Sequence, residues 1–346
     1  MRLSLVILMM ILSISLFGQT YDGWNLFIHQ KNIYTPVESA LSNMPSYVNP
    51  SLYAHTYNPA FTGMVEGNGL ETTMFKYSPA PFSDTRVRTL NGHVNINNNN
   101  ALAISYYEYN INYEPGFFSS DFEYSTATLS YSRKVTENIY AGAGLNYMKS
   151  NEAGNSDLKI FTLDIGGIYT NQFHTWENVL SNFVVQVSIN NLAGSVTEDV
   201  RTGSKKLSDY IDVYPVILEL GVANQFVMNK ILHDLNVFTL STQVEYTNSL
   251  NDPYFDYLRF GVEFSFFEMF YLRAGHVEFL TQTLEDMMGE TAPKESYGLG
   301  LEIPVHKFYN FGVECKVIFN YGQSYQNTEG SKIDEFNSYS IGVLIN

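Results

Sequence analysis

The side chains that most often carry catalysis are scattered along this chain and do not stand at catalytic spacings. No pair among its seven histidines has the separation expected of metal ligands, and the single cysteine, Cys315, forms neither an internal disulfide nor a cysteine metal cluster. The sequence contains no nucleophile elbow, phosphate-binding loop or dinucleotide fingerprint. We therefore expect a protein that is not an enzyme, with no catalytic residues, no metal and no cofactor. The histidines are His29, His55, His93, His174, His233, His276 and His306.

Three carboxylates and three cations fall on the polar faces of consecutive alternating segments in the C-terminal third of the chain. Paired carboxylates serve as general acid and base when their pKa values are tuned for proton transfer. The same residues can instead form a solvated polar network without chemistry, and we favour this second interpretation. They are Glu263, Glu302 and Glu314, with Arg259, Arg273 and Lys316.

The balance of charges is strongly acidic. The 346 residues carry 35 acidic and 19 basic side chains, which gives a formal net charge of -16. Binding to nucleic acid requires clustered Lys and Arg that neutralise phosphates, and the chain has no such clusters. We therefore expect no nucleic acid among its partners.

The N-terminus has the pattern of a secretory signal peptide. Arg2 is followed by the apolar run Leu3–Phe17 and then by the small residue Gly18. A membrane anchor is the alternative, but the run is shorter than the roughly 20 residues that a spanning helix needs. We expect residues 1–18 to be removed on export, so that the mature chain begins near Gln19.

After residue 70 the dominant pattern is alternation of apolar and polar side chains. In YLRFGVEFSF, Leu258, Phe260 and Val262 alternate with Arg259 and Glu263, and similar patterns occur in PVILELGVANQF and FYNFGVECKVIF. Such strands suit either a soluble sandwich or barrel with its apolar face inside, or a membrane barrel with its apolar face outside. An aromatic content of 15% fits the aromatic girdles of membrane barrels.

Fourteen strands are predicted, and their connections alternate between long and mostly short, as the loops and turns of outer-membrane barrels do. Residues 171–181 are an exception, because a long link stands where a short turn is expected. We therefore predict an all-β membrane β-barrel of about 14 antiparallel strands over residues 70–346, in the outer membrane of a Gram-negative bacterium. The predicted strands are 70–77, 85–96, 101–113, 122–134, 139–149, 158–170, 182–191, 213–227, 234–246, 256–267, 269–280, 296–304, 309–320 and 336–345.

The stretch YNPAFTG before the first strand has the chemistry of a rigid turn. Pro59 fixes its own φ and biases Asn58 towards an extended conformation, and Gly63 permits a sharp reversal after Ala60. Residues 19–69 have no clear period and are too long for a loop of a compact domain unless they pack on something. An ordinary loop before a strand is the alternative.

Several motifs resemble the FadL-like outer-membrane barrels, and within them the PorV and PorQ branch of the type IX secretion system. The related PorP and SprF barrels are the second choice, because YNPAFTG is similar to their NPA element. The motifs are the NPA element and the stretches LDIGGIY, VSINNLAGS, YPVILELGVA, FGVEFSFFEMFYLRAGH and YGLGLEI. The resemblance implies that residues 19–69 form a plug inside the barrel, that Asn58, Pro59, Ala60 and Gly63 make its exit turn, and that the charged network faces the plug.

The resemblance implies two functions. The first is a type IX secretion component that docks or shuttles cargo at the cell surface, with outer-membrane lipid and secretion-system proteins or secreted cargo as partners. Its contacts would be the long loops Leu192–Asp212, Thr281–Glu295 and Tyr321–Glu335. The alternative is a FadL-like transporter of hydrophobic small molecules, for which Pro215 or the Gly166-Gly167 pair would open a gap in the wall. A lipid-modifying enzyme is a third hypothesis, for which the sequence offers no constellation.

Overall fold

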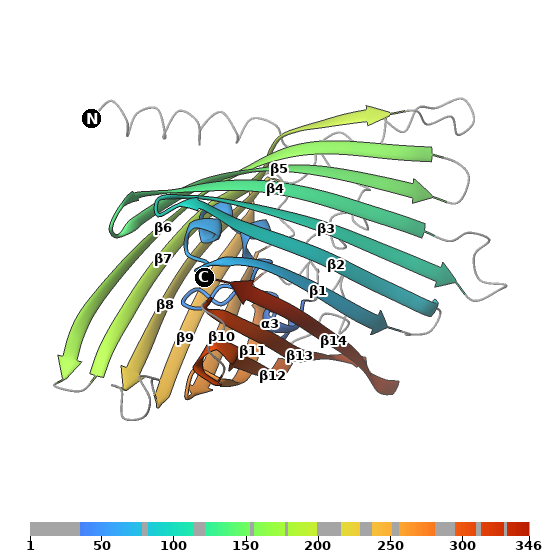
Figure 1. Cartoon of the computed structure of the whole chain (residues 1–346). Helices are drawn as coiled ribbons and strands as arrows, with labels where there is room; N and C mark the ends of the chain where they lie inside the picture. The colour runs from blue at the N-terminus through green and yellow to red at the C-terminus, as the bar shows by residue number, and fades with distance from the viewer. Residues whose placement is uncertain are drawn as a thin grey trace.

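A computed structural model of the chain contains a closed β-barrel whose fourteen strands each pair with their sequence neighbours (Figure 1). Every pairing is antiparallel, and β1 closes the barrel on β14 with Thr72 opposite Ile341. The structure describes residues 35–77, 82–113, 122–152, 156–176, 179–198, 216–228, 237–250, 256–280, 295–308, 313–328 and 331–345. The predicted signal peptide and residues 19–34 of the predicted plug lie outside these ranges.

Fourteen strands occupy most of the described chain, as predicted. The first seven are β1 (Asn68–Tyr77), β2 (Phe82–Asn97), β3 (Asn100–Tyr113), β4 (Phe122–Thr136), β5 (Ile139–Glu152), β6 (Ser156–Trp176) and β7 (Val179–Glu198). The others are β8 (Ile217–Met228), β9 (Phe238–Ser249), β10 (Tyr257–Phe266), β11 (Phe270–Phe279), β12 (Glu295–Pro304), β13 (Cys315–Thr328) and β14 (Ser331–Ile345). Short helices are α3 (Pro36–Ala40), η1 (Ala54–Thr56), η2 (Pro59–Gly63) and α5 (Val305–Phe308).

The outer face of the barrel is apolar and its inner face is polar. Outward positions carry exposed hydrophobic side chains such as Leu90, Ile104 and Leu145, and inward positions between them carry buried polar ones such as Asn91 and Asn146. Water would favour the opposite arrangement, whereas a barrel in lipid turns its apolar face outwards and satisfies every backbone group through strand pairing. The fold is therefore that of an outer-membrane β-barrel. Among the residues that the structure describes, no helix is long and apolar enough to cross a membrane.

Two short links between predicted strands are confirmed. Residues 97–100, between the strands predicted at 85–96 and 101–113, form the turn between β2 and β3, with Asn97 paired to Asn100. The link around Glu268 has three residues, because Phe266 pairs with Phe270, and Phe267 and Glu268 both adopt positive φ, as in hairpin turns whose twist matches that of the flanking strands.

Four predicted boundaries are wrong. Residues 171–181 are not a long link, because β6 continues to Trp176, which pairs with Val179 of β7. Tyr321–Glu335 is not a long loop, because β13 and β14 extend until Thr328 pairs with Ser331. In both cases polar residues made strand ends resemble loops, and ladder hydrogen bonds outweighed local propensity. The predicted loop Leu192–Asp212 begins later, because β7 continues to Glu198. The strand predicted at 309–320 begins at Cys315 and follows α5.

Candidate functional site

Residues 35–67, which we call the lumen segment, lie inside the barrel. Its first helix, α3, packs against β11 to β14, and its last, η2, packs against β3 to β6. Figure 1 shows this segment, in blue, enclosed by the strands. A buried apolar cluster lies here: Tyr47 stacks on Phe61 with ring centroids 5.6 Å apart, and Ile168 and Ala223 of the wall belong to the same cluster.

A series of inward-facing glycines seats the lumen segment against the wall. A Cβ atom built on any of these seven glycines would lie 3.1 Å or less from an atom of the segment. Side chains at these positions would keep the segment away from the strands, so the glycines allow close approach of one backbone to another. They are Gly142, Gly166, Gly221, Gly261, Gly275, Gly298 and Gly322, on seven different strands.

Asn58 combines a helix cap with anchorage to the wall. Its Oδ1 accepts a hydrogen bond from the Ala60 amide at 2.9 Å, which caps η2, and Pro59 follows at the first helical position. Its Nδ2 donates to Gln186 Oε1 at 2.8 Å and to the Val187 carbonyl at 3.1 Å. The predicted turn at the NPA element is therefore a 3-10 helix held against β6 and β7.

Gly63 ends η2, and Met64, which follows it, has a right-handed backbone conformation. The glycine is present for space, since a Cβ there would meet Ser132 Oγ at 2.6 Å. The predicted sharp reversal is therefore replaced by close packing on β4.

Tyr47 is the centre of a buried polar network between the lumen segment and the wall. Its hydroxyl donates to Glu245 and accepts from Gln186 Nε2 at 3.2 Å. Arg259 Nη1 donates to Glu245 Oε1 at 2.7 Å and to the Asn43 carbonyl at 2.6 Å. This network ties two points of the segment to β7, β9 and β10, so moving the segment would break charge-assisted hydrogen bonds.

The six charged residues singled out from the sequence all face the inside of the barrel, in three places. Arg259 pairs with Glu245 and contacts the lumen segment directly. Arg273 Nε donates to Glu263 Oε2 at 2.6 Å, and Asn49 of the segment donates to Glu263 Oε1 at 3.2 Å. Lys316 lies 3.9 Å from Glu302, and both line a cavity together with Glu314. Arg273 lines the same cavity, so the second and third groups adjoin each other, and the pair of Arg259 with Glu245 is not part of that lining.

Sequence reasoning missed several buried polar residues that contact the lumen segment. Glu245 and Gln186 stand on the polar faces of alternating segments, so the pattern that identified Glu263 could have found them. Glu38 has no such signal, because it lies in a stretch without periodicity. It is fully buried, and it accepts a hydrogen bond from Ser51 Oγ at 2.5 Å. Burial raises the pKa of Glu38 from 4.5 to about 8, and Glu71 nearby adds to the effect.

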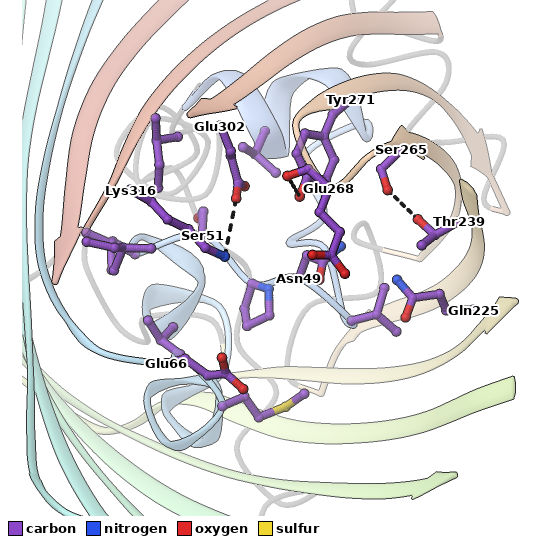
Figure 2. Close-up of a pocket in the computed structure, with 18 of the residues that line it drawn as sticks. Asn49, Ser51, Glu66, Gln225, Thr239, Ser265, Glu268, Tyr271, Glu302 and Lys316 are labelled. Atoms are coloured by element: carbon purple, nitrogen blue, oxygen red, sulfur yellow. Dashed lines mark hydrogen bonds and ion pairs between the residues drawn. The ribbon is translucent and has the colours of Figure 1, made fainter. Parts of the chain in front are cut away.

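A cavity of about 490 Å³, which we call the turn-end cavity, lies inside the barrel at the end where the short turns are. Its wall residues come from strand ends next to turns, such as Val227 of β8, Thr239 of β9 and Ser265 of β10. The lumen segment supplies residues on the other side, including Val48 and Met64. Figure 2 shows Glu302 and Lys316 projecting into this space from one wall and Gln225 from another.

The cavity is amphipathic. Apolar side chains line it from the segment and the wall, and several charged side chains line it from β11 to β13 and from the adjoining turns. A space of a few hundred cubic ångströms has the size of a site for a small molecule. Sequence reasoning identified four of its charged residues, Arg273, Glu302, Glu314 and Lys316, but not the cavity, which is formed by contacts distant in sequence.

The Gly166-Gly167 pair does not open the wall. In β6, Gly166 pairs with Gly142 and Ser188, and Gly167 pairs with Ala141 and Val187, so the ladder is continuous on both sides. Pro215 lies outside the described residues, as do residues 281–294 and 199–212 of two loops that the sequence predicts as contact sites.

Comparisons with known proteins give likeness in shape. No family model and no curated protein matches the sequence. Among solved structures, a FadL homologue from Pseudomonas aeruginosa matches at 11% identity and a TM-score of 0.47, over 89% of this chain and 97% of that one. The toluene transporters TodX of Pseudomonas putida and TbuX of Ralstonia pickettii match at 9% identity, over 90% of this chain and 97% of theirs, with TM-scores of 0.47 and 0.49. At these identities and TM-scores, the similarity identifies no functional residue and no transported molecule.

Proposed function

We propose that this chain is an outer-membrane transporter for hydrophobic small molecules, in contact with outer-membrane lipid and without catalytic activity. The turn-end cavity is the observation that carries this proposal. It lies within a lipid-facing barrel, it has the volume of a small-molecule site, and part of its lining is apolar. A molecule from the membrane environment could bind in this cavity on its way between the loop end and the turn end of the barrel.

The lumen segment gives the cavity its second property, which is closure. Segment residues from Val48 to Leu52 and from Met64 to Glu66 form one boundary of the cavity. The seats of the preceding residues Tyr47 and Met44, which are Gly221 and Gly261, lie nearer the loop ends of β8 and β10 than the cavity residues Val227 and Ser265 do. In this proposal the segment blocks free diffusion of water-soluble molecules, and passage requires binding in the cavity.

A cavity-filling substitution tests the proposal. Val227→Trp puts an indole into the cavity from an inward position, and Met228→Trp puts the same side chain on the exposed outer face one residue later. We expect cells with the wild-type chain or M228W to take up a fluorescent hydrophobic probe faster than cells without the chain, and V227W to lose most of that gain. Equal uptake by V227W and wild type, at equal amounts of folded barrel, would remove the cavity from the route.

A role in type IX secretion is the second proposal, and it rests on the resemblance to PorV and PorQ. One observation favours a protein contact at the loop end. β7 continues to Glu198 in pairing with β6, whereas its pairing with β8 ends, within the described strands, at Asn190 opposite Ile217. A strand edge that extends beyond its neighbour can accept a strand from another protein.

Purification from native outer membrane in mild detergent, followed by mass spectrometry, distinguishes the two proposals. Secretion subunits or secreted cargo that co-purify with the wild-type barrel, and that a Thr197→Pro substitution in the β7 edge removes, would support the secretion role. Thr197→Pro lies in the part of β7 beyond Asn190 and removes one backbone donor there. A barrel that carries hydrophobic ligands and no protein partner would refute the secretion proposal and support the transporter.

A further inference from the structure

We propose that the turn-end cavity selects amphiphiles whose polar group is a cation, such as an organic ammonium, over those that carry a carboxylate. This inference rests on the proposed transport function and assigns the chemical class of the transported molecule. The lining residues, their charge and the contacts of the cationic side chains support it.

The charged side chains of the cavity are mostly acidic. Within the described lining, five carboxyl groups face two permanent cations and one histidine, His306; Glu71 is buried and Glu302 lies next to Lys316, so Glu66, Glu268 and Glu314 carry most of the acidic excess. An imbalance of charge in a partly enclosed space with apolar walls creates a potential that favours ligands of opposite sign, since screening by water is weaker there. The carboxylates are Glu66, Glu71, Glu268, Glu302 and Glu314, and the cations are Arg273 and Lys316.

Both cations lie next to acceptors of the protein, Arg273 in hydrogen bonds and Lys316 at a longer distance. Arg273 is 6% exposed and donates to Glu263 at 2.6 Å and to Asn320 at 3.1 Å. Lys316 lies 3.9 Å from Glu302, and Figure 2 shows this pair on one wall of the cavity. A carboxylate ligand would have to compete with these acceptors for its counter-charge, and it would approach the remaining acidic side chains at unfavourable energy.

The apolar part of the lining fits the body of such a ligand. Val48, Met64 and Val65 of the lumen segment and Val227 of β8 are part of the same cavity. An ammonium held near the carboxylates would leave an alkyl or aryl group over this apolar surface. The cavity therefore offers an amphiphile an acidic and an apolar lining together.

Three probes of matched size test the charge preference: 2-phenylethylamine, 2-phenylethanol and 3-phenylpropionate. Binding is measured by equilibrium dialysis with the full chain in nanodiscs of zwitterionic lipid, with empty nanodiscs as the blank. We expect the amine to bind roughly tenfold more tightly than the carboxylate, with the alcohol between them, and the difference to shrink as salt rises. Equal or tighter binding of the carboxylate would overturn the proposal.

Two variants locate the selectivity. Glu66→Gln combined with Glu314→Gln removes two acidic groups that are exposed to the cavity, and Glu278→Gln removes one from the outer face. We expect the double variant to weaken amine binding severalfold with little effect on the alcohol, and E278Q to behave as wild type. Amine binding that is unchanged in the double variant and in Val227→Trp would assign it to another surface and overturn the proposal. If none of the three probes binds above the blank and V227W also leaves uptake unchanged, the transport function fails as well.

Discussion

The seat of the NPA element on β5 can be tested with one methyl group. A Cβ added at Gly142 would lie 2.5 Å from the Ala60 nitrogen and 2.6 Å from the Pro59 oxygen. These are backbone atoms, which cannot rotate away as the end of a side chain can. Gly142→Ala therefore forces η2 away from the wall or strains the backbone of β5. In either case the substitution should weaken the docking of the lumen segment.

The size of the effect follows from the contacts that the shift would break. Overpacking in a well-packed interior typically costs about 1–3 kcal/mol. Movement of η2 would also stretch the hydrogen bond from Ser132 Oγ to the Ala60 carbonyl, 3.1 Å long, and that from Asn58 Nδ2 to Gln186, each worth roughly 1 kcal/mol. We expect docking to weaken by about 2–4 kcal/mol, which corresponds to roughly 30-fold to 1000-fold faster exchange by local opening.

Hydrogen exchange with mass spectrometry measures this opening in peptides that cover residues 54–64. Gly167→Ala is the matched control, because Gly167 lies on the neighbouring strand β6 and a Cβ there meets nothing nearer than 3.7 Å. We expect G142A to lose protection in η2 while the strands keep theirs, and G167A to match wild type. Equal protection in all three proteins, or an equal loss in both variants, would refute the close seating of the segment.

Three further predictions concern the same segment. Docking should weaken as pH rises from about 4.5 towards about 8, by at most about 1.4 kcal/mol per pH unit, because docked Glu38 keeps a proton that the released segment gives up. Hydrogen exchange of residues 36–42, corrected for intrinsic rates, should show this trend in wild type and not in Glu38→Gln; a flat wild-type profile would contradict it. Tyr47→Phe should weaken docking of the segment by about 1–3 kcal/mol, because it removes the hydroxyl that joins Glu245 and Gln186. Hydrogen exchange at residues 44–48 should be faster in this variant, and unchanged exchange there would contradict the prediction. Arg273→Met should lower the melting temperature of the barrel far more than Lys316→Met. Arg273 forms a buried pair with Glu263 at 2.6 Å, whereas Lys316 is half-exposed and lies 3.9 Å from Glu302. Similar decreases in melting temperature for both variants would contradict this order.

The sequence by itself determined where most strands lie and which face of the barrel is apolar. Period-two alternation needs no tertiary information, so segments such as 257–266 and 139–149 appear as strands, and the alternation of long and short connections together with the aromatic content indicated an apolar outer face. Residues in the middle of strands, such as Arg259 and Glu263, were therefore assigned correctly to the inner face. Strand ends were less certain: at 171–176 and 321–328 ladder pairing extends strands through polar residues that read locally as loops.

The tertiary structure decided where the lumen segment lies and what it leaves open. Residues 35–67 have no period of their own, so their path depends on contacts with seven strands distant in sequence, and the glycines that admit them read as ordinary strand glycines. For the same reason the partner of Arg259 is Glu245, 14 residues away, and not the neighbouring Glu263. The turn-end cavity is the space between the segment and the wall, and no local pattern encodes such a space, because it depends on the register of every strand around it.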